Sequence, residues 1–209
     1  MRTSASLFLF ALPLGLAAPV IDSRAAGDTM NGLAAGAPCK AMTVVFARGT
    51  TETGNVGTLS GPPYFKALMK MTGGDMAVQG VEYPADIPGF LAGGDAKGSQ
   101  KMAQLVMQAM TTCPDTKVVM AGYSQGGQLV HNAAAMLPPD MAAMVSSAVI
   151  FGDPMNGKPV QGVSAAQTKV ICHNGDLICA GTSTILQPHL TYSQNAQEAA
   201  TFTMKSAGM

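Results

Sequence analysis

Residues 118–127 read Val-Val-Met-Ala-Gly-Tyr-Ser-Gln-Gly-Gly and contain the pattern Gly-x-Ser-x-Gly, with serine at position 124. A short apolar run precedes the pattern, and residues 125–137 after it read as a helix. This order of strand, sharp turn and helix is typical of a nucleophile elbow, which places a serine hydroxyl above the end of a parallel sheet. Gly122 and Gly126 fit such a turn, because a Cβ there would collide where strand and helix converge. The pattern alone is weak evidence, so its context decides.

The rest of the chain alternates strand patterns with helical patterns. A helix is expected to begin at Pro62 and Pro63, another carries the apolar positions of 102–109, and the closing segment from about 193 to 205 is helical. The expected strands span residues 42–47, 77–83, 117–123, 147–151 and 168–172. This alternation predicts an α/β fold, a three-layer α/β/α sandwich around a central, mainly parallel five-stranded sheet.

The N-terminal residues predict the compartment. Arg2 precedes an apolar run at 7–12, and small residues follow at 15, 17 and 18, which indicates a secretory signal peptide over residues 1–17. Residues 18–38 are mostly small or polar and are expected to form a mobile leader or possible pro-segment. Residues 39–209 then form a single domain. We expect a secreted, extracellular protein, and no later stretch is long enough to be a transmembrane segment.

The charge and composition of the chain limit the classes of partner that it is expected to bind. The formal net charge is zero and no basic cluster occurs, so no nucleic acid is expected as a partner. Charged residues make up only 11% of the chain, against about 25% in an average soluble protein. This composition fits either a small secreted protein with a weakly charged surface or a face that approaches an apolar substrate.

Four cysteines remain after the expected signal peptide, at positions 39, 113, 172 and 179. An even number in an oxidising compartment suggests two disulfides, for which three connectivities are possible. The short spacing favours a local bridge between Cys172 and Cys179, which would leave Cys39 to pair with Cys113. Zinc is the rival interpretation, but no C-x-x-C or H-x-x-x-H spacing supports it. We expect neither a cofactor nor a metal.

A nucleophilic serine needs a base, and the chain has three histidines. His131 lies seven residues beyond Ser124 on the same helix, roughly 10 Å along its axis, and is interpreted as an ordinary helix histidine. His173 adjoins Cys172 at a strand end. His189 lies in the apolar loop 185–190 before the final helix, and its position late in the chain matches the order serine, acid, histidine. His189 is the expected base and His173 the alternative.

Two acids compete to orient that base. Asp153 ends a strand before Pro154, where a turn or cap role is the ordinary interpretation. Asp176 lies in the short loop between Cys172 and Cys179, and a constrained loop suits a carboxylate that must hold an imidazole in one tautomer. Asp176 is therefore the expected acid.

An oxyanion hole needs two backbone N–H groups. One is expected from Gln125 and the other from residues 48–50, after the first strand. The Thr50 hydroxyl could add a third donor, although a plain turn threonine is the alternative. Arg48 and Glu52 are expected to pair and hold this loop.

Four stretches occur together in one order: the elbow 122–126, the loop Ala-Arg-Gly-Thr-Thr-Glu-Thr-Gly-Asn at 47–55, the loop 172–179 around Gly-Asp-Leu, and Pro-His-Leu at 188–190. From about Cys39 to the C-terminus the chain thus resembles the fungal cutinases, which are secreted serine esterases of the α/β-hydrolase fold. The resemblance implies a small α/β-hydrolase with no large lid. Carried over by position, it implies a catalytic triad, an oxyanion hole at Thr50 and Gln125, and two disulfides. The triad is Ser124, Asp176 and His189, and the bridges are Cys39–Cys113 and Cys172–Cys179.

The resemblance also implies that apolar loops at 87–91 and 185–190 form a rim that meets the substrate, whereas partial core burial is the alternative. Where the family often has serine, this chain has Thr50, which keeps the hydroxyl but crowds the site.

The expected function is therefore hydrolysis of carboxylic esters in cutin-like polyesters and short-chain esters by a monomer, through an acyl-enzyme. Acetylxylan esterase of the same superfamily is the alternative enzyme, although those enzymes usually have more cysteines. A secreted non-catalytic binding or effector protein on the same fold is the alternative from another class.

Overall fold

The computed structural model describes residues 27–34 and 36–209, whose centre is a sheet of five parallel strands. The sheet order is β2-β1-β3-β4-β5, with every neighbouring pair parallel. The strands are β1 (Met42–Ala47), β2 (Met76–Gly80), β3 (Lys117–Tyr123), β4 (Ser147–Phe151) and β5 (Thr168–Ile171). The expected signal peptide at 1–17 lies outside the described residues.

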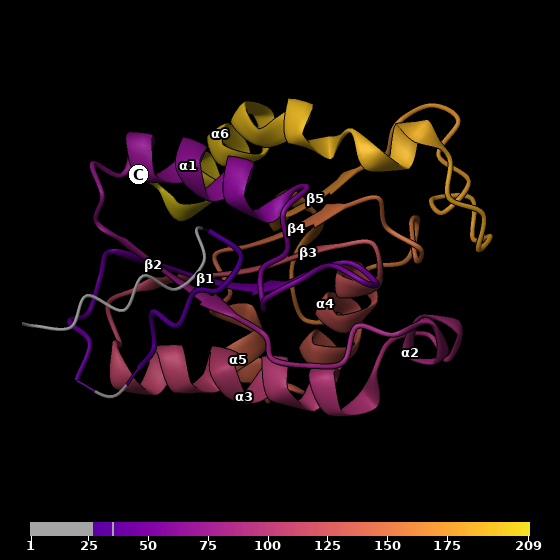
Figure 1. The fold of residues 1–209 in the computed structure, drawn as a ribbon. Coiled ribbons are helices and arrows are strands. Elements are labelled where there is room, and N and C mark those ends of the chain that lie inside the picture. The colour runs from indigo at the N-terminus through magenta and orange to yellow at the C-terminus, as the bar shows by residue number, and fades with distance from the viewer. Residues whose placement is uncertain (1–26, 35) are drawn as a thin grey trace, which may run out of the picture.

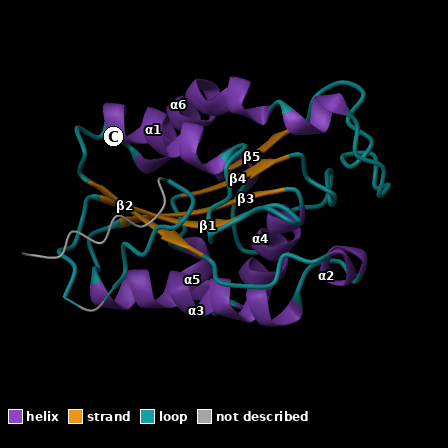
Figure 2. Ribbon diagram, in the orientation of Figure 1, coloured by secondary structure: helices purple, strands orange, loops and turns teal. Residues whose placement is uncertain are grey.

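Helices cover both faces of this sheet (Figure 1). One face carries α1 (Gly61–Met71) and α6 (Ala196–Ala207). The other carries α3 (Ala96–Thr112), α4 (Gln125–Met136) and the short α5 (Pro139–Ala143). Figure 2 shows the strands as the middle layer between these two groups of helices. The predicted three-layer α/β/α sandwich is confirmed.

The strand sequences are nearly all apolar because both faces of the sheet are buried. In β1, Val44 and Phe46 pack toward α1 and α6, whereas Val45 and Ala47 pack toward α3 and α4. Each of these side chains has 0% of its surface exposed. The same run of apolar residues therefore builds the cores on both sides of the sheet.

The sheet has a topological switch point between β1 and β3. After β1 the chain moves outward to β2, and after β3 it moves in the opposite direction to β4 and β5. Binding crevices of open α/β sheets lie at the carboxyl ends of the two strands that flank such a point. Thr50 follows β1 and Ser124 follows β3, so two of the expected site residues lie beside this crevice.

Three elements differ from the sequence-based expectation. The second strand ends at Gly80 rather than Tyr83, shortly before Pro84, and leaves the sheet edge earlier. Residues expected to form a loop make the short helix α2 (Ile87–Leu91), whose N-cap Asp86 accepts a hydrogen bond of 2.8 Å from Gly89 N–H. The closing helix begins at Ala196, after a 3-10 turn at Tyr192–Asn195.

Part of the expected leader or possible pro-segment 18–38 contacts the sheet. Within its described part, Asn31 forms an antiparallel bridge with Gln79 of β2. The N–H of Gly32 donates to the carbonyl of Val78 at 2.8 Å, and the N–H of Gly80 donates to the carbonyl of Met30 at 2.8 Å. The segment 28–33 thus lies along the outer edge of β2.

Asn55 joins this segment to the loop that follows β1. Its side chain is 1% exposed, accepts from Met30 N–H at 2.8 Å, and donates to Asn31 Oδ1 at 3.0 Å. The carbonyl of Asp28 accepts from the N–H groups of Asn55 and Val56, both at 2.9 Å. The loop after β1 therefore rests on the N-terminal segment.

We expect Asn55→Ala to lower the free energy of unfolding by about 2–3 kcal/mol, because it removes a buried side chain whose hydrogen bonds to Met30 N–H and Asn31 Oδ1 join two segments. Urea unfolding followed by circular dichroism measures this change. Asn174→Ala, at an exposed position, is the control and should change stability little. Equal stability of the two variants would contradict the anchoring role of Asn55.

Candidate active site

Ser124 occupies the turn between β3 and α4. Its backbone has φ 56° and ψ −120°, a sparsely populated conformation for a residue with a side chain. The turn is so tight that a Cβ at Gly126 would lie 2.0 Å from the carbonyl oxygen of Ala47, and one at Gly122 would lie 2.3 Å from that of Gly126. The Ser124 N–H donates to the carbonyl of Phe151 in the neighbouring strand at 2.9 Å. The sequence therefore specifies the elbow through both glycines.

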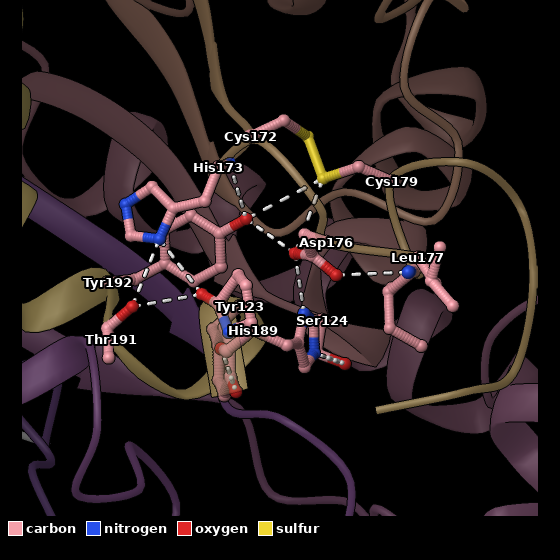
Figure 3. A network of polar contacts seen from close by, with 12 residues as sticks. Tyr123, Ser124, Cys172, His173, Asp176, Leu177, Cys179, His189, Thr191 and Tyr192 are labelled. Carbon is pink, nitrogen blue, oxygen red and sulfur yellow. Dashed lines mark hydrogen bonds and ion pairs between the residues drawn. A yellow bond between two sulfur atoms is a disulfide. The ribbon is translucent and has the colours of Figure 1, made fainter. Parts of the chain in front are cut away.

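His189 lies between Ser124 and Asp176 (Figure 3). Its Nε2 is 2.9 Å from Ser124 Oγ, and its Nδ1 is 2.8 Å from Asp176 Oδ2. A carboxylate only accepts hydrogen bonds, so Nδ1 carries the proton and Nε2 is free to accept from the serine hydroxyl. All three side chains are buried, and Ser124 is 4% exposed. This arrangement can remove a proton from the serine hydroxyl during nucleophilic attack.

The loop after β5 holds the acid. Cys172 and Cys179 form a disulfide across it, and Asp176 Oδ1 accepts from the Ile178 N–H at 3.0 Å. Burial alone would raise the pKa of Asp176, but hydrogen bonds from Tyr192 and His189 outweigh it and hold that pKa below its ordinary value. Asp176 therefore remains an ionised acceptor for the imidazole.

The base is held by the 3-10 turn Gln187–Leu190 and by Tyr123, the last residue of β3. The Tyr123 hydroxyl donates to the His189 carbonyl at 2.8 Å. The two rings also stack, with centroids 5.1 Å apart. The strand that ends in the elbow thus also positions the histidine.

The other histidines and the alternative acid, Asp153, make contacts that do not involve Ser124. His173 Nδ1 is 2.9 Å from the Pro188 carbonyl and its Nε2 is 2.6 Å from Asn195 Oδ1, so neither nitrogen faces Ser124. His131 was expected to be an ordinary helix histidine. It is instead buried, with 5% of its surface exposed, and its Nε2 lies 2.9 Å from Asp153 Oδ2. Asp153 is fully buried and also accepts from Met155 N–H. These two form a separate histidine–aspartate pair.

Thr50 and Gln125 lie together beside Ser124. Gln125 Nε2 donates to Thr50 Oγ1 and to the Asp86 carbonyl, both at 2.8 Å. Because both amide protons are used, Thr50 Oγ1 accepts from Gln125 and keeps its own proton for another acceptor. The main-chain N–H groups of Thr50 and Gln125 have no protein acceptor within the described part of the chain. These three donors are therefore available to a ligand.

Arg48 contacts Glu52 as expected, but through the main-chain carbonyl of Glu52 and not through its carboxylate. Arg48 instead donates to two main-chain carbonyls, those of Glu52 and Tyr83, both at 2.7 Å. The Glu52 carboxylate accepts from the N–H groups of Gly49, Thr58 and Leu59 at 2.8–2.9 Å. Both charged side chains hold the loop, but each does so through the backbone, because the tight turn leaves main-chain groups that need partners.

A pocket of about 270 Å³ opens at Ser124, and its walls are mostly apolar. The surrounding side chains extend into solvent, with Ile87 59%, Leu91 67% and Ile185 54% exposed. The two loops expected to form a rim are thus at the mouth of the pocket, and partial core burial is ruled out for these three residues. The lining residues are Thr50, Ile87, Phe90, Leu91, Ser124, Ile178, Ser183 and Ile185.

The cysteines pair as the short spacing and the resemblance suggested, Cys39 with Cys113 and Cys172 with Cys179. Because all four are in disulfides, none offers a thiolate to zinc. Among the described residues, no helix has the length and apolar composition needed to span a bilayer.

Sequence reasoning missed two contributors to this site. Tyr192 donates to Asp176 Oδ2 at 2.5 Å, and the side chain of Gln125 orients the Thr50 hydroxyl. Tyr192 lies only three residues beyond His189, and its place just before a helix gave no sign of this contact. For Gln125, its place directly after the expected nucleophile was an available signal.

Comparisons of sequence and of structure with known proteins point to the same family. A family model described as Cutinase matches residues 38–207. A cutinase of Botryotinia fuckeliana is 54% identical over 215 residues, and one of Monilinia fructicola is 53% identical over 213, with 100% of each chain covered in both cases. A solved Trichoderma reesei cutinase in complex with a phosphonate inhibitor has a TM-score of 0.81 at 44% identity, covering 87% of this chain and 80% of that one. An acetylxylan esterase structure has a TM-score of 0.67 at 23% identity, covering 82% and 100%, which shows a shared fold alone.

Proposed function

The chain belongs to the cutinase family and is a serine esterase, and from this premise we propose that it hydrolyses cutin-like polyesters and short-chain esters with Ser124 as nucleophile. The observation that carries the assignment is the continuous contact from Ser124 Oγ through both nitrogens of His189 to Asp176, at the mouth of an apolar pocket. His189 is the proposed base and Asp176 the proposed orienting acid.

In the first half of the reaction, Ser124 Oγ attacks the ester carbonyl carbon while His189 Nε2 takes the hydroxyl proton. Asp176 stabilises the imidazolium that forms. The tetrahedral intermediate then collapses, the carbon–oxygen bond to the alcohol breaks, and His189 gives its proton to the departing alcohol. An acyl group remains on Ser124. In the second half, water attacks this acyl-enzyme with the same proton transfers and releases the acid.

We assign the oxyanion hole to the N–H groups of Thr50 and Gln125, with the Thr50 hydroxyl as a third donor. The support is that these groups lie beside Ser124 without protein acceptors, and that Gln125 Nε2 forces the hydroxyl proton to point elsewhere. Donors fixed before the reaction need no reorganisation when charge develops on the carbonyl oxygen.

We expect Thr50→Val to lower kcat about 10- to 100-fold, since one donor to the oxyanion is lost. Thr50→Ser keeps the hydroxyl and is the matched control, with a kcat near that of the unchanged protein. Steady-state kinetics on a soluble butyrate ester measure both. A Thr50→Val enzyme as active as Thr50→Ser would remove the hydroxyl from the oxyanion hole.

The shape of the site supports a bulky substrate. The exposed apolar residues at 87, 91 and 185 surround the pocket, and they can contact the aliphatic chains of a polyester while one ester group reaches Ser124.

We further propose that the protein is secreted after cleavage near residue 17. We also propose that residues 28–33 form one unit with the rest of the domain, and that the protein acts as a monomer.

The test is labelling with a phosphonate ester, which reacts with an activated serine, followed by peptide mass spectrometry. The label is expected on Ser124 at one equivalent per chain, with parallel loss of butyrate ester hydrolysis. Release of aliphatic hydroxy acids from cutin, without comparable release of acetate from acetylated xylan, would support the polyester substrate. Label on another residue would contradict the nucleophile, and preference for the xylan would contradict the substrate.

A further inference from the structure

Asp176 has a third partner besides His189 and the Ile178 backbone. The Tyr192 hydroxyl lies 2.5 Å from Asp176 Oδ2, the same oxygen that His189 Nδ1 contacts. Figure 3 shows the carboxylate between the tyrosine and the histidine. Two proton donors therefore converge on one oxygen atom in a buried site.

The direction of the tyrosine hydrogen bond follows from its neighbours. The His173 N–H donates to the Tyr192 oxygen at 3.0 Å, so this oxygen is an acceptor there. The single phenolic proton then points to Asp176, which can only accept. Burial, together with the contact to Asp176, raises the pKa of Tyr192 above its ordinary value and keeps that proton in place.

The tyrosine ring is held as firmly as its hydroxyl. Tyr192 is 1% exposed, its ring stacks on His173 at 4.2 Å between centroids, and it meets the His189 ring edge-on at 6.0 Å. A Cβ at Gly152 would lie 2.8 Å from the Tyr192 ring and 2.7 Å from that of His189. Glycine at this position allows both rings to pack against the end of β4.

We propose that Tyr192 is a positioning residue for the hydrolysis, acting through Asp176: its hydroxyl fixes the carboxylate oxygen that orients His189. With Ile178 N–H on Oδ1 and Tyr192 on Oδ2, the carboxylate is held at both oxygens. It cannot rotate away when His189 becomes positively charged. Charge-assisted hydrogen bonds of this kind are the strong ones in proteins. The proposal rests on the proposed roles of Ser124, His189 and Asp176.

The test replaces Tyr192 by phenylalanine, which keeps the ring and removes only the hydroxyl. The matched control is Tyr64→Phe, because Tyr64 is also fully buried and its hydroxyl contacts Thr203 Oγ1 at 2.6 Å, between α1 and α6. For Y192F we expect kcat on a butyrate ester to fall about 10-fold with KM unchanged, because the base is less well positioned. Y64F should keep both constants. The low-field NMR signal of the His189 Nδ1 proton should move in Y192F alone.

A second comparison separates positioning from loss of structure. In an Asp176→Asn background, Tyr192→Phe should lower the remaining activity by less than about twofold, because residues that act through one another are not additive. An unchanged kcat and NMR signal in Y192F, or an equal loss in both backgrounds, would overturn the proposal. If Ser124→Ala left hydrolysis intact, the proposed function would fail instead, so the two failures are distinguishable.

Discussion

Replacing Ser124 by alanine is expected to lower hydrolysis of a soluble butyrate ester about 10⁴- to 10⁶-fold, the largest effect of any single change in this chain. The hydroxyl is the only group lost, and the pocket and the oxyanion donors remain. Alanine also accepts the φ of 56° no worse than serine does, so the fold should be as stable as before. Initial rates and thermal unfolding of the same preparation measure both quantities.

A folded Ser124→Ala protein that still hydrolyses the ester would refute the nucleophile. If the unchanged protein were folded but inactive, the non-catalytic binding function would gain support. The phosphonate label should likewise be absent from the alanine variant, which links the loss of activity to the same atom.

Replacing Asp176 by asparagine is expected to lower kcat about 10⁴-fold at neutral pH, with little change in KM. An amide has nearly the shape of the carboxylate, but its NH₂ group can donate to His189 Nδ1. The imidazole then carries its proton on Nε2, where it cannot accept one from Ser124. The hydrogen bonds from Ile178 and Tyr192 favour an oxygen at both positions, so the variant should also lose some stability.

Asp153→Asn is the control for this prediction. Asp153 is also buried and lies 2.9 Å from a histidine, His131, but neither residue of that pair hydrogen-bonds Ser124 or His189. We expect a kcat near that of the unchanged protein and a lower melting temperature. Similar losses of activity in the two variants would mean that Asp176 acts through general stability rather than through the tautomer of His189.

The elements with the strongest local signals were predicted correctly. The strand before Ser124, the helix after it and the buried run of β1 were recognisable because close packing at the elbow demands glycine, and a strand covered on both faces demands continuous apolar residues. His189 and Asp176 were chosen over their rivals from chain order and from the short cysteine loop. The structure places them in one line of contacts with Ser124.

The remaining features depend on contacts between distant parts of the chain. The end of β2 at Gly80 is tied to Met30, fifty residues earlier, and no local pattern predicts such a partner. The short helix α2 begins at the Asp86 cap inside a Pro- and Gly-rich stretch that reads as a loop. Tyr192 contributes through one hydroxyl that reaches across to Asp176. Propensity and periodicity describe neighbours in sequence, and these contacts are not among them.

The N-terminal segment has a consequence for the behaviour of the protein in concentrated solution. The outer edge of a sheet offers unpaired N–H and C=O groups to which another molecule can add a strand, the first step of many aggregation reactions. Residues 30 and 32 already occupy Gly80 N–H and Val78 C=O on the edge of β2. A protease that trimmed the chain as far as Cys39 would uncover this edge, and it would also remove the partners of Asn55 in the loop that carries Thr50. Such a trimmed protein should therefore self-associate more readily than the full chain.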